Sequence, residues 1–224
     1  MGVIGMSYNR AAEGSMYMYE AAQTITINTK DVYHAVIGAS AGSHEIGFTF
    51  LASATGEITD TENNGGVLRC TNKLPTHGLT TGQFITLNGM GDALHNGVTG
   101  VTVIDQNTFD CDDIAYNSID DTGSWQRGSS LTIDAGYGGT YTGGYSITGK
   151  VASANKNFKA EVYAGTTAFD EFATERLFGN TGFGVAASGG IGKLPAGSVL
   201  WVAVQNTTDT TNLVIEHMNL HLSK

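Results

Sequence analysis

The chain has 224 residues, enough to bury a sizeable core and to hold one large or two modest domains. Hydrophobic residues make up 41% of it, and 31 glycines stand against only 2 prolines, a composition typical of a turn-rich globular protein and unlike that of a disordered one. With Lys+Arg 11 and Asp+Glu 21 the formal net charge is −10, which opposes binding to nucleic-acid phosphates. A nucleic-acid partner is therefore disfavoured.

Membrane and targeting signals are absent from the sequence pattern. No apolar run approaches the roughly 20 residues that cross a bilayer. Residues 1–10 carry no basic stretch followed by an apolar one, as a secretory leader would. We expect neither a membrane partner nor a targeting segment.

Residues 1–22 are rich in methionine and tyrosine but show neither clean alternation nor a helical stripe. They predict an extended N-terminal arm, because exposed apolar side chains on a terminal segment commonly dock on a neighbour. The candidate partner-binding residues are Met6, Tyr8, Met16, Tyr17, Met18 and Tyr19. The alternative is a first strand that follows a frayed terminus.

Alternating apolar and polar residues then predict strands on both sides of a central segment. They occupy 24–28, 32–37, 46–51, 122–133, 139–151, 157–164, 185–191, 198–206 and 213–222. About eight strands suit a two-sheet jelly roll, which we place at 23–65 and 119–224. Residues 169–178 are predicted as a short helix or an irregular loop.

The central segment, 66–118, has shorter strands with turns such as Asn96-Gly97 between them. This spacing predicts a small antiparallel β-barrel inserted into the jelly roll. Polar residues at 60–66 and 114–121 are expected to form the two connectors. The expected fold is all-β, a jelly-roll sandwich with an inserted barrel.

Cys70 and Cys111 fall on the first and last strands expected in the insert, which can lie side by side in a small barrel. A disulfide between them is one possibility. Two reduced thiols are the other, since two cysteines make no disulfide framework.

Sequence motifs of catalysis are missing: there is no Gly-x-Ser-x-Gly elbow, phosphate-binding Walker loop, paired Cys-x-x-Cys or His-Glu-x-x-His. We assign no catalytic residue, no cofactor and no metal, and expect no enzyme. Glu161, Glu171 and Glu175 leave a carboxylate pair formed in space as an open alternative.

Two groups of possible ligands are better explained without a metal. His217 and His221 share one face of a predicted strand, which suits surface or interface histidines, although a ring of them around a trimer axis could collect an ion. The acidic residues are Asp110, Asp112, Asp113, Asp120 and Asp121. They lack the spacing of a calcium loop and suit a solvated strand face, with a loop-bound cation as the alternative.

Five aromatic residues raise the question of sugar binding: Tyr137, Tyr141, Tyr145, Trp125 and Trp201. Such side chains can stack on sugars. They serve more often in cores and subunit contacts, and that is the interpretation we favour.

The insert resembles a small β-barrel module of tailed-phage virion proteins, which is similar to the first catalytic-cysteine half-domain of ubiquitin-activating enzymes. The matching stretches are His77-Gly78-Leu79, 85–89 with Gly82, Asn96-Gly97, and 103–109. The likeness is to a scaffold and implies no ubiquitin chemistry.

The outer strands resemble the jelly roll of tumour-necrosis-factor and complement-like trimers. The matching stretches are Gly139-Thr140-Tyr141, Glu161-Val162-Tyr163, 194–199 and the strand of Trp201. Residues 24–222 together resemble a recurrent virion family of tailed phages. The resemblance implies a homotrimer in the virion, in contact with capsid or other virion proteins, as a capsid decoration or short spike. The alternative is a receptor- or carbohydrate-binding module of a tail fibre, whose partner is a host surface glycan.

Overall fold

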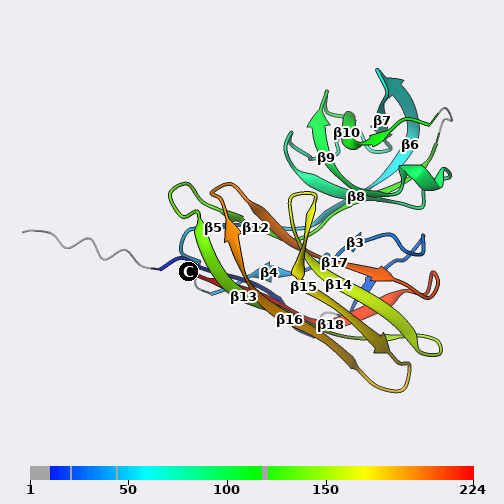
Figure 1. Ribbon diagram of the computed structural model, residues 1–224. Coiled ribbons are helices and arrows are strands. Elements are labelled where there is room, and N and C mark those ends of the chain that lie inside the picture. Colours follow the sequence, from blue (N-terminus) through cyan, green and yellow to red (C-terminus); the bar gives the residue numbers. More distant parts are fainter. Residues whose placement is uncertain (1–10, 21, 44, 118–120) are drawn as a thin grey trace, which may run out of the picture.

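The computed structural model describes residues 11–20, 22–43, 45–117 and 121–224. These residues form an all-β protein of two modules, a two-sheet sandwich and a small barrel above one end of it (Figure 1). The helical element of the described chain is one 3-10 turn, η1 (Ala93–His95). No helix among the described residues has the length and apolar character needed to cross a membrane.

The sandwich is a jelly roll of two antiparallel sheets, which confirms the predicted fold class. Sheet 1 runs in the order β16 (Gly184–Leu194), β13 (Gly139–Val151), β18 (Leu213–Ser223), β1 (Glu13–Met18) and β4 (Ser40–Ala41), and β2 (Gln23–Ile25) also pairs with β18. Sheet 2 runs β15 (Thr167–Phe178), β14 (Lys156–Ala164), β17 (Val199–Asn206), β12 (Ser130–Ile133) and β5 (Phe48–Leu51), and β3 (His34–Ala35) pairs with β17.

The main core lies between these sheets and follows from strand alternation. On β13, Tyr141, Tyr145 and Ile147 point inward and are buried, while Thr142, Gly144 and Ser146 lie on the outer face. Tyr145 donates a 2.7 Å hydrogen bond to the Ala160 carbonyl of the opposite sheet. Burial raises the pKa of Tyr145 to about 12, so this hydroxyl keeps its proton and its bond at neutral pH.

The barrel is closed and six-stranded, so it has no free edge. Its order is β10 (Thr108–Ala115), β7 (Val67–Asn72), β6 (Ala54–Asn64), β11 (Gly123–Arg127), β8 (Phe84–Asn88) and β9 (Gly97–Val103). β6 and β11 lie outside the expected bounds 66–118, so the barrel spans 54–127. β6 pairs with β11 from Gly123↔Ile58 to Arg127↔Ala54, which brings the two ends of the module together.

Two sequence-based expectations about local structure were wrong. The polar stretch 60–66 is no connector: β6 continues to Asn64, and Gly65 and Gly66, both with positive φ, turn the chain into β7 as a barrel hairpin. Residues 169–178 form no helix or loop but most of β15, where a register shift opposite Ala160 and Val162 interrupts the alternation.

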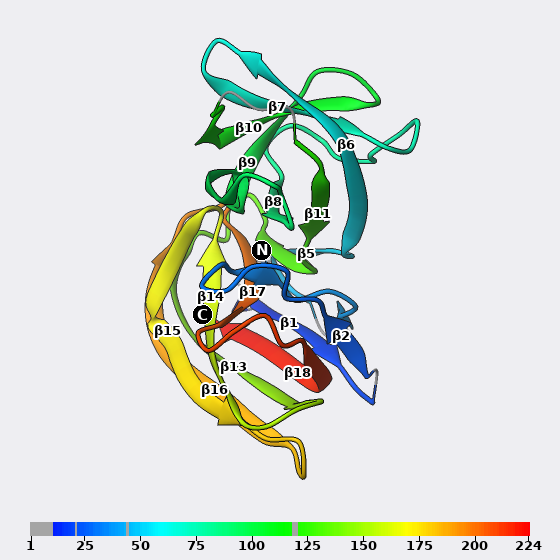
Figure 2. The same ribbon diagram turned by 90° about the vertical axis from the view of Figure 1, so that its right-hand side faces the viewer.

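The barrel rests on the outer face of sheet 2 (Figures 1 and 2). A separate small apolar cluster at this junction contains Ala35, Tyr163, Trp201 and Ala203, with Val98 of the barrel packed against it. The barrel therefore covers part of the outer side of sheet 2, whereas nothing among the described residues covers sheet 1 in the same way.

Candidate functional site

The outer face of sheet 1 carries short side chains on the adjacent strands β13 and β16, and longer polar side chains on β18. Ser146 of β13 lies between Ala187 of β16 and Asn219 of β18, and Asn219 in turn lies opposite Tyr17 of β1. The neighbouring row places Gly144 beside Gly189, His221 and Ser15 in the same manner. We call these two rows the small-residue face; it contains no Asp, Glu, Lys or Arg.

Two of its glycines permit a close approach of neighbouring backbones. A Cβ atom on Gly144 would lie 2.9 Å from the Ser188 carbonyl oxygen, and one on Gly189 would lie 3.0 Å from the Gly143 carbonyl oxygen. Side chains at these positions would have to shift the strands. The centre of the face thus exposes backbone and short side chains.

Exposed apolar side chains flank this face on both sides. Among the described residues, five of the nine exposed large hydrophobics belong to β1, β16 or the segments next to them. They are Tyr17, Tyr19, Phe183, Val185 and Ile191. Such clustering on one side of a protein is typical of an interaction surface.

The candidate partner-binding residues divide into three groups. Met16 and Met18 are buried in the sandwich core, 0% and 4% exposed, because β1 pairs with both β18 and β4. They therefore do not present a surface to a partner, and the extended-arm interpretation is wrong for 13–18. Tyr17 and Tyr19 are exposed. Met6 and Tyr8 lie outside the described residues.

Of the two histidines of β18, His221 belongs to the second row of the small-residue face, and His217 lies beside the first row. His221 contacts Glu13 with a 3.3 Å Nε2 to Oε1 distance, and the ring of His217 lies 5.0 Å from that of Tyr19. Asn219 is exposed between them on the same face. Both histidines thus have partners across β1 and belong to the sheet surface.

The acidic residues are dispersed into separate structural contacts. Asp110 holds Arg69 in a two-pronged ion pair, with Nε to Oδ1 at 2.7 Å and Nη2 to Oδ2 at 3.1 Å. Asp113 accepts from the Gly100 amide at 2.8 Å, and Asp121 is buried. Asp112 is exposed, and Asp120 is not among the described residues. Within the described ranges no three His, Cys, Asp or Glu side chains gather where they could hold a metal ion.

The aromatic residues considered for sugar stacking are mostly inside the protein. Tyr141, Tyr145, Trp125 and Trp201 are at most 3% exposed. The Trp201 indole donates to the Gly165 carbonyl at 2.9 Å and stacks on Tyr163. These four side chains therefore act as packing groups.

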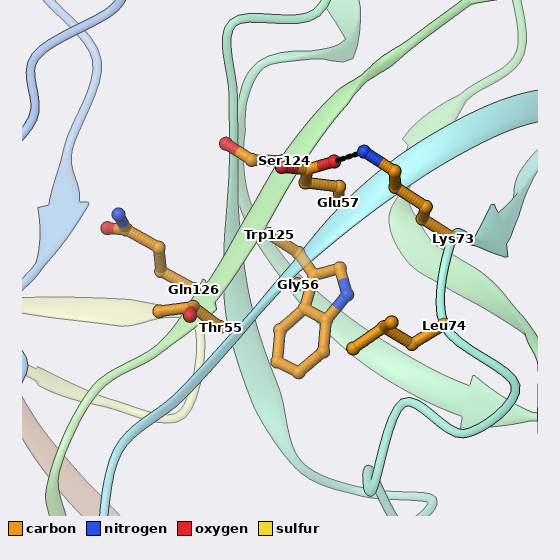
Figure 3. A pocket seen from close by; sticks show the side chains of 8 residues that line it. All are labelled: Thr55, Gly56, Glu57, Lys73, Leu74, Ser124, Trp125 and Gln126. Carbon is orange, nitrogen blue, oxygen red and sulfur yellow. Dashed lines mark hydrogen bonds and ion pairs between the residues drawn. The ribbon is translucent and has the colours of Figure 1, made fainter.

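A pocket of about 390 Å³ opens beside Trp125, between β6, β11 and the chain after β7 (Figure 3). An ion pair between Glu57 and Lys73 borders it, and the exposed Leu74 side chain points toward the indole. The Trp125 ring is only 1% exposed and its Nε1 donates to Asn72 at 2.9 Å. The indole thus offers no free face on which a sugar could stack.

One predicted carboxylate has an unusual environment. Glu161 is 1% exposed on the outer side of sheet 2 and forms an ion pair with Lys159. Burial, followed by the influence of the nearby Glu161 carboxylate, raises the pKa of the Tyr33 hydroxyl. Glu171 and Glu175 are exposed on β15, so the three carboxylates differ strongly in solvation.

The two cysteines are free thiols in the barrel core, and their sulfur atoms are 3.7 Å apart.

Comparison with known proteins adds no further assignment: no family model matches the chain, and no curated protein sequence matches it.

Proposed function

We propose that the protein is a non-enzymatic structural component of a tailed-phage virion that assembles as a homotrimer through the small-residue face of sheet 1. The observation that carries the proposal is this face, whose two rows contain no Asp, Glu, Lys or Arg, include the exposed Tyr17 and are bordered by Val185 and Ile191. Association there would remove apolar surface from water without desolvating an unpaired charge.

Closed symmetry is the usual outcome when one chain associates with copies of itself. The jelly roll with its inserted barrel, and the resemblance to phage virion proteins and to trimeric jelly rolls, support a threefold arrangement. The barrel sits on sheet 2, on the other side of the sandwich (Figure 2), so trimer formation through sheet 1 would leave it free to project. A capsid decoration or short spike is the role that fits such a geometry.

Sedimentation at micromolar concentration tests the assembly. The wild-type chain is expected to sediment at three times its 23.4 kDa mass. Ala187→Arg places a charge in the central row and is expected to yield a monomer with an unchanged circular dichroism spectrum. Ala93→Arg, the same change at an exposed alanine of the barrel, is the control and should remain trimeric. A wild-type monomer, or an unaltered A187R trimer, would contradict the proposal.

The virion assignment has a separate test. Mass spectrometry of purified phage particles from the source of this sequence should find its peptides at a stoichiometry that is a multiple of three. Their absence from intact particles would exclude a structural role in the virion while leaving the trimer open.

A further inference from the structure

A small cavity lies at the junction of the two modules, between the barrel and the outer face of sheet 2. Its volume is about 150 Å³. The barrel contributes Phe84 and Arg127, and sheet 2 contributes Ser130, Thr132 and Trp201. Junctions between structural modules are frequent ligand sites, because side chains from both sides converge there.

Arg127 is the charged group of this cavity, and its charge has no counterpart. Its Nη1 donates to Gln83 Oε1 at 2.8 Å and its Nη2 to the Ala52 carbonyl at 3.0 Å, both neutral acceptors. The Nε atom is buried and has no hydrogen-bond partner. Among the described residues no carboxylate lies within ion-pair distance of this guanidinium, in a chain with 21 acidic residues.

Arg69, in the same barrel, is an arginine whose charge is paired with a carboxylate, and it serves as a comparison. Asp110 grips it with two hydrogen bonds, and this contact, as the largest influence, raises the pKa of Arg69. Burial lowers the pKa of Arg127 instead. A part-buried cation without an anion is costly, and a guanidinium cannot escape the cost by losing its proton at neutral pH.

The rest of the cavity indicates the size and chemistry of the missing anion. Five waters would fill about 150 Å³ at roughly 30 Å³ each, so the space suits a ligand of a few heavy atoms. Ser130 and Thr132 supply hydroxyl groups from the sheet, and Phe84 and Trp201 supply apolar wall. The planar, forked guanidinium matches the two oxygens of a carboxylate.

We propose that this cavity binds a small monocarboxylate of about the size of acetate, held by Arg127 and assisted by the hydroxyls of Ser130 and Thr132. The bound anion neutralises Arg127 and ties β11 of the barrel to β12 of the sandwich. This site is independent of the small-residue face, so its test does not depend on self-association.

Nuclear magnetic resonance of the arginine side chains tests the site directly with acetate as the probe. Sodium acetate is titrated against sodium chloride and sodium sulfate at equal ionic strength. The Nε–H signal of Arg127 is expected to shift with acetate in a saturable manner, while that of Arg69 stays in place because Asp110 already occupies it. Equal shifts of both signals, or a larger response to sulfate, would overturn the proposal.

Thermal unfolding of variants supplies the second readout. Acetate should raise the melting temperature of the wild type relative to chloride, because a ligand of the native state stabilises it. Arg127→Met should lose this increment, and Thr132→Phe, which fills the cavity and keeps the arginine, should weaken acetate binding by about tenfold or more. Arg176→Met, at an exposed arginine of β15, should respond like the wild type. An undiminished increment in both R127M and T132F would refute the site.

Discussion

His95 and Asp121 meet inside the barrel at a distance of 3.0 Å between Nδ1 and Oδ2, although 26 residues separate them in the chain. The other ring nitrogen, Nε2, accepts from the Asn117 amide at 3.1 Å, which makes Nδ1 the donor to the carboxylate. Asp121 also accepts from the amides of Gly91 and Asp92, at 2.6 and 2.9 Å. One buried carboxylate thus closes the η1 turn against the start of β11.

We expect Asp121→Asn to destabilise the barrel by about 2–4 kcal/mol, because an amide cannot accept from every donor that now points at the carboxylate. Urea unfolding measures the change, followed by the fluorescence of Trp125 in a Trp201→Phe background so that the signal reports on the barrel. Asp112→Asn is the matched control: Asp112 is exposed on β10, and its substitution should alter stability by less than about 0.5 kcal/mol. Similar losses in both variants would show that Asp121 has no special role.

The same carboxylate predicts a pH dependence. Burial raises the pKa of Asp121, but hydrogen bonds from Asp92, His95 and Gly91 outweigh it and hold the pKa below the ordinary 3.8. A carboxyl with a depressed folded-state pKa contributes stability above its unfolded pKa and loses it as the pH falls. The stability difference between wild type and D121N should therefore shrink below about pH 4. A difference that stays constant from pH 7 to pH 3 would contradict this assignment.

Excision of the barrel should leave the sandwich folded if the cut is made at the pair Ala54 and Arg127, which face each other across β6 and β11. Replacement of 54–127 by a short Gly/Ser linker is expected to retain a cooperative thermal transition. Replacement of 67–118 should behave worse, because it removes β7 to β10 and leaves β6 and β11 paired only with each other. If the longer excision unfolds the protein while the shorter one does not, the module boundary proposed from the sheet pairing is incorrect.

Local alternation was enough to predict which residues of the sandwich face inward where a strand pairs regularly with both neighbours, as along β18 with Leu220 and Leu222. Alternation failed to predict burial where a residue is covered by strands that are distant in the sequence. From the sequence, Met16 and Met18 are predicted to be exposed on an arm. In the structure they are part of β1, which pairs with β4 on one side and with β18 on the other. The sequence could not identify Arg127 as an arginine without an ion-pair partner, because its surroundings include Gln83 and Trp201 of sheet 2, which are distant from it in the sequence.

The placement of β1 leads to a prediction about N-terminal truncation. Removal of residues 1–11 should leave the sandwich intact, whereas removal of 1–20 should abolish cooperative folding, because it deletes a strand that pairs on both sides. Met16→Ala should cost about 2–5 kcal/mol, as expected for a fully buried methionine. Tyr17→Ala, one residue away but exposed, is the control and should have little effect on the monomer's stability. Circular dichroism melts of the four variants decide the matter, and a folded 1–20 deletion would disprove the structural role of β1.

Cys70 and Cys111 should not react with thiol reagents in the native protein. Both are fully buried in the barrel, and burial raises the pKa of the Cys111 thiol, so the reactive thiolate is scarce even when a reagent reaches it. Labelling with iodoacetamide at pH 7.5, followed by mass spectrometry, should modify neither residue before the barrel opens and both after unfolding in urea. In D121N the labelling rate should rise in step with the loss of barrel stability, because opening of the barrel precedes the reaction. D112N should label as slowly as the wild type. Fast modification of either cysteine in the native wild type would mean that the barrel opens far more readily than its closed hydrogen-bonded order implies.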